Sequence, residues 1–142
     1  MEGYKEYFVV AIYKEGCSLK PDQEVISIDE IQPLETLLFE SNVNFFLADP
    51  ERIFSQKNPI RLIFNEGMPF KCFVQEGNHR LFVLNKLGFK KLVIERTEDY
   101  WRNVLESFLE SVMEAFNAGI KKLEQLKVVE DEELLEIFSM EN

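Results

Sequence analysis

The chain has 142 residues, of which 46% are hydrophobic and 30% charged, and its formal net charge is −10. This length and hydrophobic content suffice for one domain with a buried core and exclude a wholly disordered chain. No window approaches the roughly 18–20 consecutive apolar residues of a membrane helix, and the N-terminal segment has no small-residue cleavage site. We therefore expect a soluble, cytoplasmic protein with no membrane partner.

The acidic charge is concentrated toward the C-terminal end. Residues 1–94 carry 13 acidic and 11 basic side chains (net −2), whereas residues 95–142 carry 13 and 5 (net −8). Because nucleic acid attracts clusters of Lys and Arg, this distribution disfavours autonomous nucleic-acid binding but permits a small anion in one local pocket. Cys17 and Cys72 form no CxxC pair, so we interpret both as reduced thiols.

The first part of the chain predicts two strands followed by helices. A β-branched and aromatic run predicts a strand over residues 6–13, and EVISI predicts a second over residues 24–28. From Gln32 to about Ser55 the apolar residues recur with helical spacing. Asp49 and Pro50 should divide this region into two short helices, because the residue before proline avoids the helical conformation.

A hairpin and a strand-helix-strand unit follow. Residues 60–64 and 70–75, joined by turn-forming residues, predict the hairpin. A short helix is then opened by Gly77 and Asn78 and closed by Gly88, and residues 91–95 predict another strand. The order strand, helix, strand predicts a compact β-α-β unit, and such units usually bind ligands at the polar tip between the first strand and the helix.

The C-terminal third predicts helices. Apolar residues recur every three or four positions and predict one long amphipathic helix from about Thr97 to Lys127, weakened locally at Gly119. The members of this apolar stripe are Trp101, Val104, Leu105, Phe108, Val112, Phe116, Ile120 and Leu123. The acidic run at residues 130–133 predicts the start of a final short helix. We therefore expect an α/β fold (α+β, with a mixed sheet) in residues 1–96 and a helical extension in residues 97–142.

Most familiar catalytic signatures are absent from the sequence, which contains no GxxxxGK[ST], GxGxxG, GxSxG or HExxH. His79 is the single histidine, which excludes a His-rich metal site. Attention falls on the segment QEGNHR, residues 75–80. Gly77 allows a sharp turn there, and Asn78 is the expected N-cap of the following helix.

The chemistry of this turn suits a phosphate group. The free N–H groups of Asn78, His79 and Arg80 would lie at a positive helix end, beside the Arg80 guanidinium. Glu76, at the end of the preceding strand, would face the same opening and bind a metal ion or act as a general base. The same residues also have a purely structural interpretation, in which His79 hydrogen-bonds the adjacent strand and Arg80 pairs with Glu76.

The stretch FVQEGNHRLFVLNKLGFKKLVIE resembles the strand–[DE]GxHR–helix–LG–strand signature of the ParB/sulfiredoxin superfamily, especially its ParB-like "nuclease" domains. The segments EVISIDEIQP and NPIRLIF are similar to the opening strand of that family and to the strand before its hairpin. The resemblance covers about residues 23–95 and implies a ParB/sulfiredoxin-like core. It explains neither the first strand nor the C-terminal helices.

The resemblance implies a nucleotide ligand. In this superfamily the turn binds nucleotide phosphates: sulfiredoxins use ATP, chromosome-partitioning members hydrolyse CTP, and an archaeal branch phosphorylates serine with ADP. By motif position, Gly77, Asn78, His79 and Arg80 match the phosphate turn and Glu76 the acidic residue. The implied cofactor is ATP, ADP or CTP with Mg²⁺, the implied catalytic residues are Glu76, His79 and Arg80, and the implied metal ligand is Glu76.

The sequence departs from several members of the family. Sulfiredoxins carry a catalytic cysteine where this chain has Asn78, and Cys72 is expected to be buried within the preceding strand, which disfavours peroxiredoxin repair. The kinase branch uses a further acidic residue early in the domain, for which Glu30 and Glu35 are both candidates. Nuclease action is disfavoured because one acidic residue and one histidine do not make a two-metal site.

Two functions from different classes are compatible with this sequence. The first is binding of a nucleotide or phosphorylated small molecule at residues 76–80, with phosphoryl transfer or nucleotide hydrolysis if the protein is an enzyme. The second is a non-enzymatic interaction or dimerisation module. In that case the apolar stripe from Trp101 to Leu123 would form a homodimer or bind a partner helix.

Overall fold

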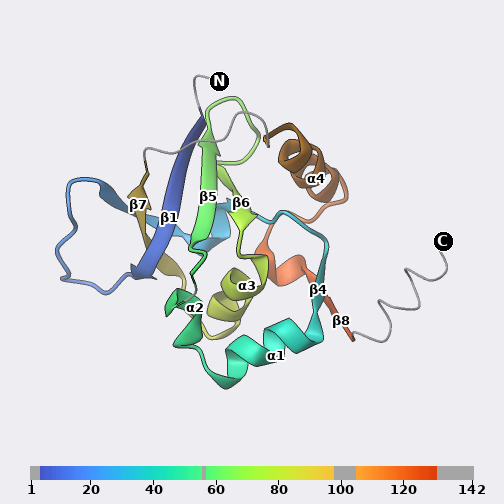
Figure 1. Ribbon diagram of the computed structural model, residues 1–142. Helices are drawn as coiled ribbons and strands as arrows, with labels where there is room; N and C mark the ends of the chain where they lie inside the picture. The colour runs from blue at the N-terminus through green and yellow to red at the C-terminus, as the bar shows by residue number, and fades with distance from the viewer. Residues whose placement is uncertain (1–3, 56, 98–104, 131–142) are drawn as a thin grey trace.

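Six strands form one mixed β-sheet in the computed structural model, which describes residues 4–55, 57–97 and 105–130 (Figure 1). The strand order is β2-β7-β1-β5-β6-β3, and only the β3–β6 pair is parallel. The strands are β1 (Tyr4–Ile12), β2 (Gln23–Ser27), β3 (Ile31–Gln32), β5 (Ile60–Asn65), β6 (Cys72–Glu76) and β7 (Lys91–Arg96). The α+β class with a mixed sheet is thereby confirmed.

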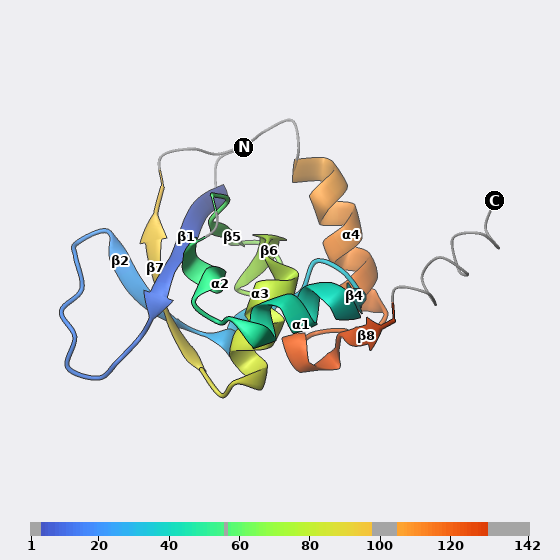
Figure 2. The ribbon, with the colours of Figure 1, turned by 60° about the horizontal axis from the view of Figure 1, so that its bottom comes forward.

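The helices lie in two groups around this sheet. Figures 1 and 2 show α1, α2 and α3 together at one end of the sheet and α4 beside β6. Their bounds are α1 (Glu40–Ala48), α2 (Arg52–Ser55), α3 (Asn78–Lys86) and α4 (Leu105–Asn117), with short 3₁₀ turns η1 (Ile28–Glu30) and η2 (Leu123–Gln125). Two further strands, β4 (Leu37–Phe39) and β8 (Lys127–Val129), pair in parallel as a separate small sheet.

The hairpin and the helix after it form where the sequence predicts. β5 and β6 are antiparallel, and Leu62 pairs with Val74. At the end of α3, Gly88 has φ +94° and donates its N–H to the Asn85 carbonyl (3.0 Å), and Phe89 donates its N–H to the Leu84 carbonyl (3.0 Å), as a glycine C′ residue allows. Gly88 therefore closes α3 as expected.

The helix predicted to begin near Gln32 begins instead at Glu40. The chain before it forms β3 and β4, and the backbone of β4 pairs with β8 near the other end of the chain. Leu38, in β4, is fully buried. The helical spacing of the leucines was misleading because this distant strand partner has no local signal. The division at Asp49 and Pro50 is confirmed, since α1 ends at Ala48 and α2 begins at Arg52.

The prediction that the C-terminal helix continues to Lys127 is wrong. Within the described residues α4 ends at Asn117, and Gly119 follows with φ +89°. Gly119 N–H bonds the Phe116 carbonyl (3.1 Å) and Ile120 N–H bonds the Ala115 carbonyl (2.9 Å), the pattern of a glycine-terminated helix. Gly119 therefore ends the helix, although the apolar residues continue with helical spacing beyond it. The predicted start of this helix at residues 98–104 and the final helix at residues 131–142 lie outside the described residues.

The expected β-α-β unit is also corrected. β6, α3 and β7 do follow one another, but β1 and β5 lie between β6 and β7 in the sheet. β6 is antiparallel to β5, β5 to β1, and β1 to β7, so β6 and β7 run in opposite directions. The order of β6, α3 and β7 along the chain therefore does not decide which strands lie beside one another in this sheet. The strand–helix turn at residues 76–78 is nevertheless present.

Helices cover both faces of the sheet. Residues that pair directly on neighbouring strands share a face, so Tyr7, Leu62 and Val74 lie on one face, where they share a buried cluster with Leu81 of α3. Ile63 and Phe73 lie on the other face and contact Val112 of α4.

Residues that follow β7 also contribute to the main core. Leu123 and Leu126 are buried in the same cluster as Leu81 and Leu84. The domain boundary expected near Arg96 stays a prediction, since residues 98–104 lie outside the described part. Over residues 4–55, 57–97 and 105–130, no helix has the length and hydrophobicity needed to cross a bilayer.

Candidate functional site

The turn between β6 and α3 is built on Gly77. Its φ of +112° lies in the left-handed region, and it is the N-cap of α3. A Cβ at this position would lie 3.0 Å from side-chain atoms of Ile60. Both the backbone conformation and the close approach to β5 therefore require glycine here.

Asn78 is the first residue of α3 and not its N-cap, so this prediction is wrong. The side chain is only 6% exposed, and its Oδ1 accepts the N–H of Leu34 at 3.2 Å. The amide thus joins α3 to the chain between β3 and β4. A tertiary partner has taken the oxygen that local capping would have used.

The N-terminus of α3 opens into a cavity of about 340 Å³. The first intrahelical hydrogen bond runs from Leu81 N–H to the Gly77 carbonyl, so the three preceding N–H groups have no acceptor within the helix. The residues that line the cavity are Leu34, Glu35, Asn42, Phe46, Asn58, Gln75, Glu76, Gly77, Asn78, His79 and Arg80. All five residues singled out from the sequence thus meet at one cavity.

Arg80 is a buried cation at the base of this cavity. It is 5% exposed, and its Nη1 donates to the Asn58 carbonyl (2.7 Å) and, more weakly, to the Ile53 carbonyl (3.4 Å). Nη2 lies 3.9 Å from Oε1 of Glu76. Burial lowers the pKa of Arg80, and the charge of Glu76 opposes that shift. Arg80 therefore holds the chain between α2 and β5 and places a positive charge beside the helix end.

His79 joins α3 to the start of α1. Its Nε2 accepts the N–H of Phe39 at 3.0 Å, which requires the neutral ring with its proton on Nδ1. Burial lowers the pKa of His79, which agrees with a neutral ring. While this hydrogen bond holds, Nε2 does not accept a proton from a substrate, and the structural interpretation of His79 is the one that this geometry supports.

Two carboxylates also line the cavity at the N-terminus of α3. Glu76 ends β6 with its side chain about half exposed, and Glu35 comes from the segment between β3 and β4. The pKa of Glu35 is raised, mainly by desolvation and further by the negative charge of Glu76.

The other acidic candidate, Glu30, does not line this cavity. Its Oε1 accepts the N–H of Ser27 at 3.2 Å, and its Oε2 lies 3.3 Å from Nζ of Lys71. Glu30 therefore caps η1, and only Glu35 is placed to act together with Glu76.

Gln75 belongs to the segment singled out from the sequence, but no role was predicted for it, and it too lines the cavity. It is 4% exposed, and within the described residues its Oε1 has no hydrogen-bond partner. A buried amide oxygen without a partner carries a desolvation cost that a hydrogen bond from a ligand or water, or a bound cation, would remove. The signal in the sequence was a polar residue in an apolar strand, directly before Glu76.

The cavity fits a magnesium ion only together with a phosphate. Among the described residues no group of three or more His, Cys, Asp or Glu side chains is arranged to hold a metal. Glu35 and Glu76 supply two carboxylates, which suffice for Mg²⁺ when phosphate oxygens and water complete its octahedral shell. The donor set therefore suits a metal–phosphate ligand and does not suit a metal centre built by the protein alone.

Cys72 takes no part in this site. It is 1% exposed within β6, as expected, and burial strongly raises the pKa of its thiol. Its side chain is inaccessible as a nucleophile.

Comparisons of this chain with protein-family models, with curated proteins and with solved structures find no match. The case for function therefore depends on the cavity itself.

Proposed function

We propose that the protein binds the phosphate group of a nucleotide or of a phosphorylated small molecule at the N-terminus of α3, together with Mg²⁺ held by Glu35 and Glu76. One observation carries this proposal: the N–H groups that precede Leu81 in α3, a pair of carboxylates and the Gln75 amide oxygen, which has no partner among the described residues, meet at one cavity of about 340 Å³. This volume lies in the range of small-molecule sites.

The charges in the cavity support a ligand that carries both signs. The helix end and Arg80 attract an anion, whereas Glu35 and Glu76 repel one. A Mg²⁺–phosphate complex satisfies both, because the cation lies against the carboxylates and the phosphate oxygens lie against the backbone N–H groups. A bare anion would leave the two carboxylates unopposed.

The proposal agrees with the resemblance to the ParB/sulfiredoxin superfamily, which we propose as the relationship of this chain. The phosphate turn of that superfamily corresponds to Gly77, Asn78, His79 and Arg80 of this chain. The additional acidic residue of its kinase branch corresponds to Glu35. The ligand that this relationship supports is ATP, ADP or CTP.

The same residues have roles in a phosphoryl transfer or a hydrolysis. The N–H groups of α3 would stabilise the charge that develops on the phosphoryl oxygens, and Mg²⁺ would neutralise part of that charge. Glu35 and Glu76 would hold Mg²⁺, so that the metal ion and the phosphate oxygens bound to it are oriented against the helix end. Arg80 and His79 would hold the loops around the ligand in position.

The alternative, a module that dimerises through the apolar stripe, has no specific observation in its favour. In the described part of the stripe, Val112 is fully buried against Ile63 and Phe73 of the same chain, and Phe108 packs beside it. This part of the stripe is used internally.

The proposal is tested by thermal unfolding with ATP, ADP, CTP and inorganic phosphate, each with and without Mg²⁺. At about 100 times its dissociation constant a ligand should stabilise the fold by about 2.7 kcal/mol, which raises Tm by several degrees. We expect a shift that requires Mg²⁺ and that both Glu35→Gln and Glu76→Gln reduce. Glu51→Gln, at an exposed position outside the cavity, is the matched control. The absence of a shift with every ligand contradicts the proposal.

A further inference from the structure

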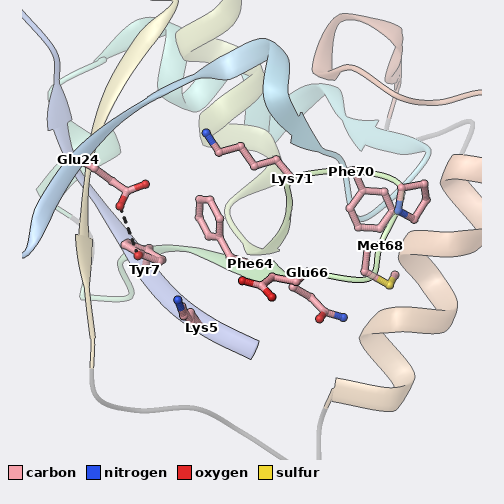
Figure 3. A pocket seen from close by; sticks show the side chains of 10 residues that line it. Lys5, Tyr7, Glu24, Phe64, Glu66, Met68, Phe70 and Lys71 are labelled. Carbon is pink, nitrogen blue, oxygen red and sulfur yellow. Dashed lines mark hydrogen bonds between the residues drawn. The ribbon is translucent and has the colours of Figure 1, made fainter. Parts of the chain in front are cut away.

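A second and larger cavity, of about 620 Å³, lies on the sheet face that carries Tyr7 (Figure 3). The residues that line it are Lys5, Tyr7, Glu24, Phe64, Asn65, Glu66, Met68, Pro69, Phe70 and Lys71. It shares no residue with the cavity at α3. Strands β1, β2 and β5 form one wall, and the loop of the β5–β6 hairpin forms the other.

The floor of this cavity is aromatic. Lys5 pairs with Phe64 across β1 and β5, and Tyr7 lies two residues further along β1, so all three side chains share one face. The rings of Tyr7 and Phe64 have their centroids 4.7 Å apart at 56°. Phe70 adds a third ring from the hairpin loop (Figure 3). Because the rings of Tyr7 and Phe64 are already in contact, a flat apolar group would pack against them and not between them.

Charges of opposite sign lie on either side of this floor. Glu24 accepts a hydrogen bond from the Tyr7 hydroxyl (3.4 Å), which fixes its carboxylate at one side. Lys5 lies on the other side of Tyr7 (Figure 3) and, among the described residues, has no ion-pair partner. The second cation, Lys71, is already paired with Glu30 at 3.3 Å. The cavity therefore offers one free ammonium group and one positioned carboxylate.

We propose that this cavity binds a zwitterionic aromatic molecule, the simplest of which is a free aromatic amino acid. The ring would lie against Tyr7 and Phe64, the carboxylate would pair with Lys5, and the ammonium group would pair with Glu24. A purely anionic ligand would lie beside the carboxylates of Glu24 and Glu66, and a purely cationic one beside Lys5. Only a ligand with both charges is complementary to Lys5 and Glu24 together. This inference does not depend on the phosphate site.

The test is a titration of the ¹⁵N-labelled protein with L-phenylalanine, followed by NMR. A range up to about 20 mM covers the affinity expected for a ligand of this size. We expect saturable changes in the amide signals of residues 64–68, 70 and 71. The analogues 3-phenylpropionate, which lacks the ammonium group, and 2-phenylethylamine, which lacks the carboxylate, should each bind about tenfold more weakly.

Substitutions at the exposed residues Lys5 and Glu24 test which charge of the ligand each residue binds. Lys5→Met and Glu24→Gln should each weaken binding of L-phenylalanine about tenfold, whereas Lys20→Met and Glu15→Gln, the same changes at exposed positions outside the cavity, should leave it unchanged. Dispersed amide spectra of each variant establish that it is folded. The proposal is overturned if L-phenylalanine does not bind, if its analogues bind as tightly, or if Lys5→Met and Glu24→Gln bind it with wild-type affinity.

Discussion

Glu35 and Glu76 lie on different elements of the fold, yet they line the same cavity, and the negative charge of Glu76 contributes to the raised pKa of Glu35. Two carboxylates at one helix N-terminus would repel a phosphate group unless a cation lies between them and the phosphate. This relationship links the fold to the proposed Mg²⁺–phosphate ligand, and it can be measured without any ligand.

Glu76→Gln should lower the pKa of Glu35 without returning it to the ordinary value of 4.5, because desolvation is the larger cause of the shift and stays in place. Titration of the side-chain carboxyl carbons by NMR measures this directly. Glu40→Gln, at an exposed position outside the cavity, should leave the pKa of Glu35 unchanged. An identical pKa in wild type and Glu76→Gln would show that the two carboxylates do not interact.

Gly77→Ala should destabilise the fold by about 2 kcal/mol or more, since it adds a strained φ and a contact with Ile60. Two control substitutions separate these causes. Gly16→Ala adds a side chain at φ +85° in open space and should cost about 1 kcal/mol, and Gly67→Ala has neither problem and should cost almost nothing. Urea unfolding gives all three values. Equal costs at positions 16 and 77 would contradict the close approach to Ile60.

His79 should make stability depend on pH. Burial holds the folded pKa of His79 below its ordinary value of 6.5, so the unfolded chain binds the proton more readily. Its contribution is therefore complete above about pH 6.5 and is lost as the pH falls through the folded pKa. His79→Gln keeps an acceptor for Phe39 N–H but does not titrate. The free energy of unfolding from pH 8 to 5.5 should fall more in wild type than in His79→Gln, and parallel profiles would refute this.

Arg80→Ala should destabilise the fold by about 2–4 kcal/mol, because the carbonyls of Ile53 and Asn58 lose a charged donor and the side chain leaves a void. Arg52→Ala is the control. Arg52 is exposed and pairs with Asp49 at 3.1 Å on the surface, so its removal should cost less than about 1 kcal/mol. Chemical denaturation compares them, and an equal cost at both positions would contradict the structural role of Arg80.

The sequence predicted the parts of the fold that local rules govern. The β5–β6 hairpin, the ends of α3 at Gly77 and Gly88, and the division at Pro50 follow from turn and cap chemistry within a few residues. The pairing of β4 with β8 and the separation of β6 from β7 depend on distant partners, which local patterns do not report.

The candidate site shows the same division. The motif placed Glu76 and the helix N–H groups correctly beside one another, because they are neighbours along the chain. It did not reveal that Asn78 binds Leu34, that His79 binds Phe39, or that the buried Gln75 Oε1 has no partner in the described part of the chain, since each depends on tertiary packing. Of the two acidic candidates, only the folded chain separates Glu35 from Glu30.

The most direct test of the phosphate site follows the backbone amides themselves. The ¹⁵N-labelled protein is titrated with ATP, ADP and CTP in the presence of Mg²⁺. If the N-terminus of α3 binds phosphate, the largest changes should occur at the amide signals of Asn78, His79 and Arg80, and Glu76→Gln should reduce them. No change in these signals at the highest nucleotide concentration, or larger changes at a distant surface, would contradict the proposed function.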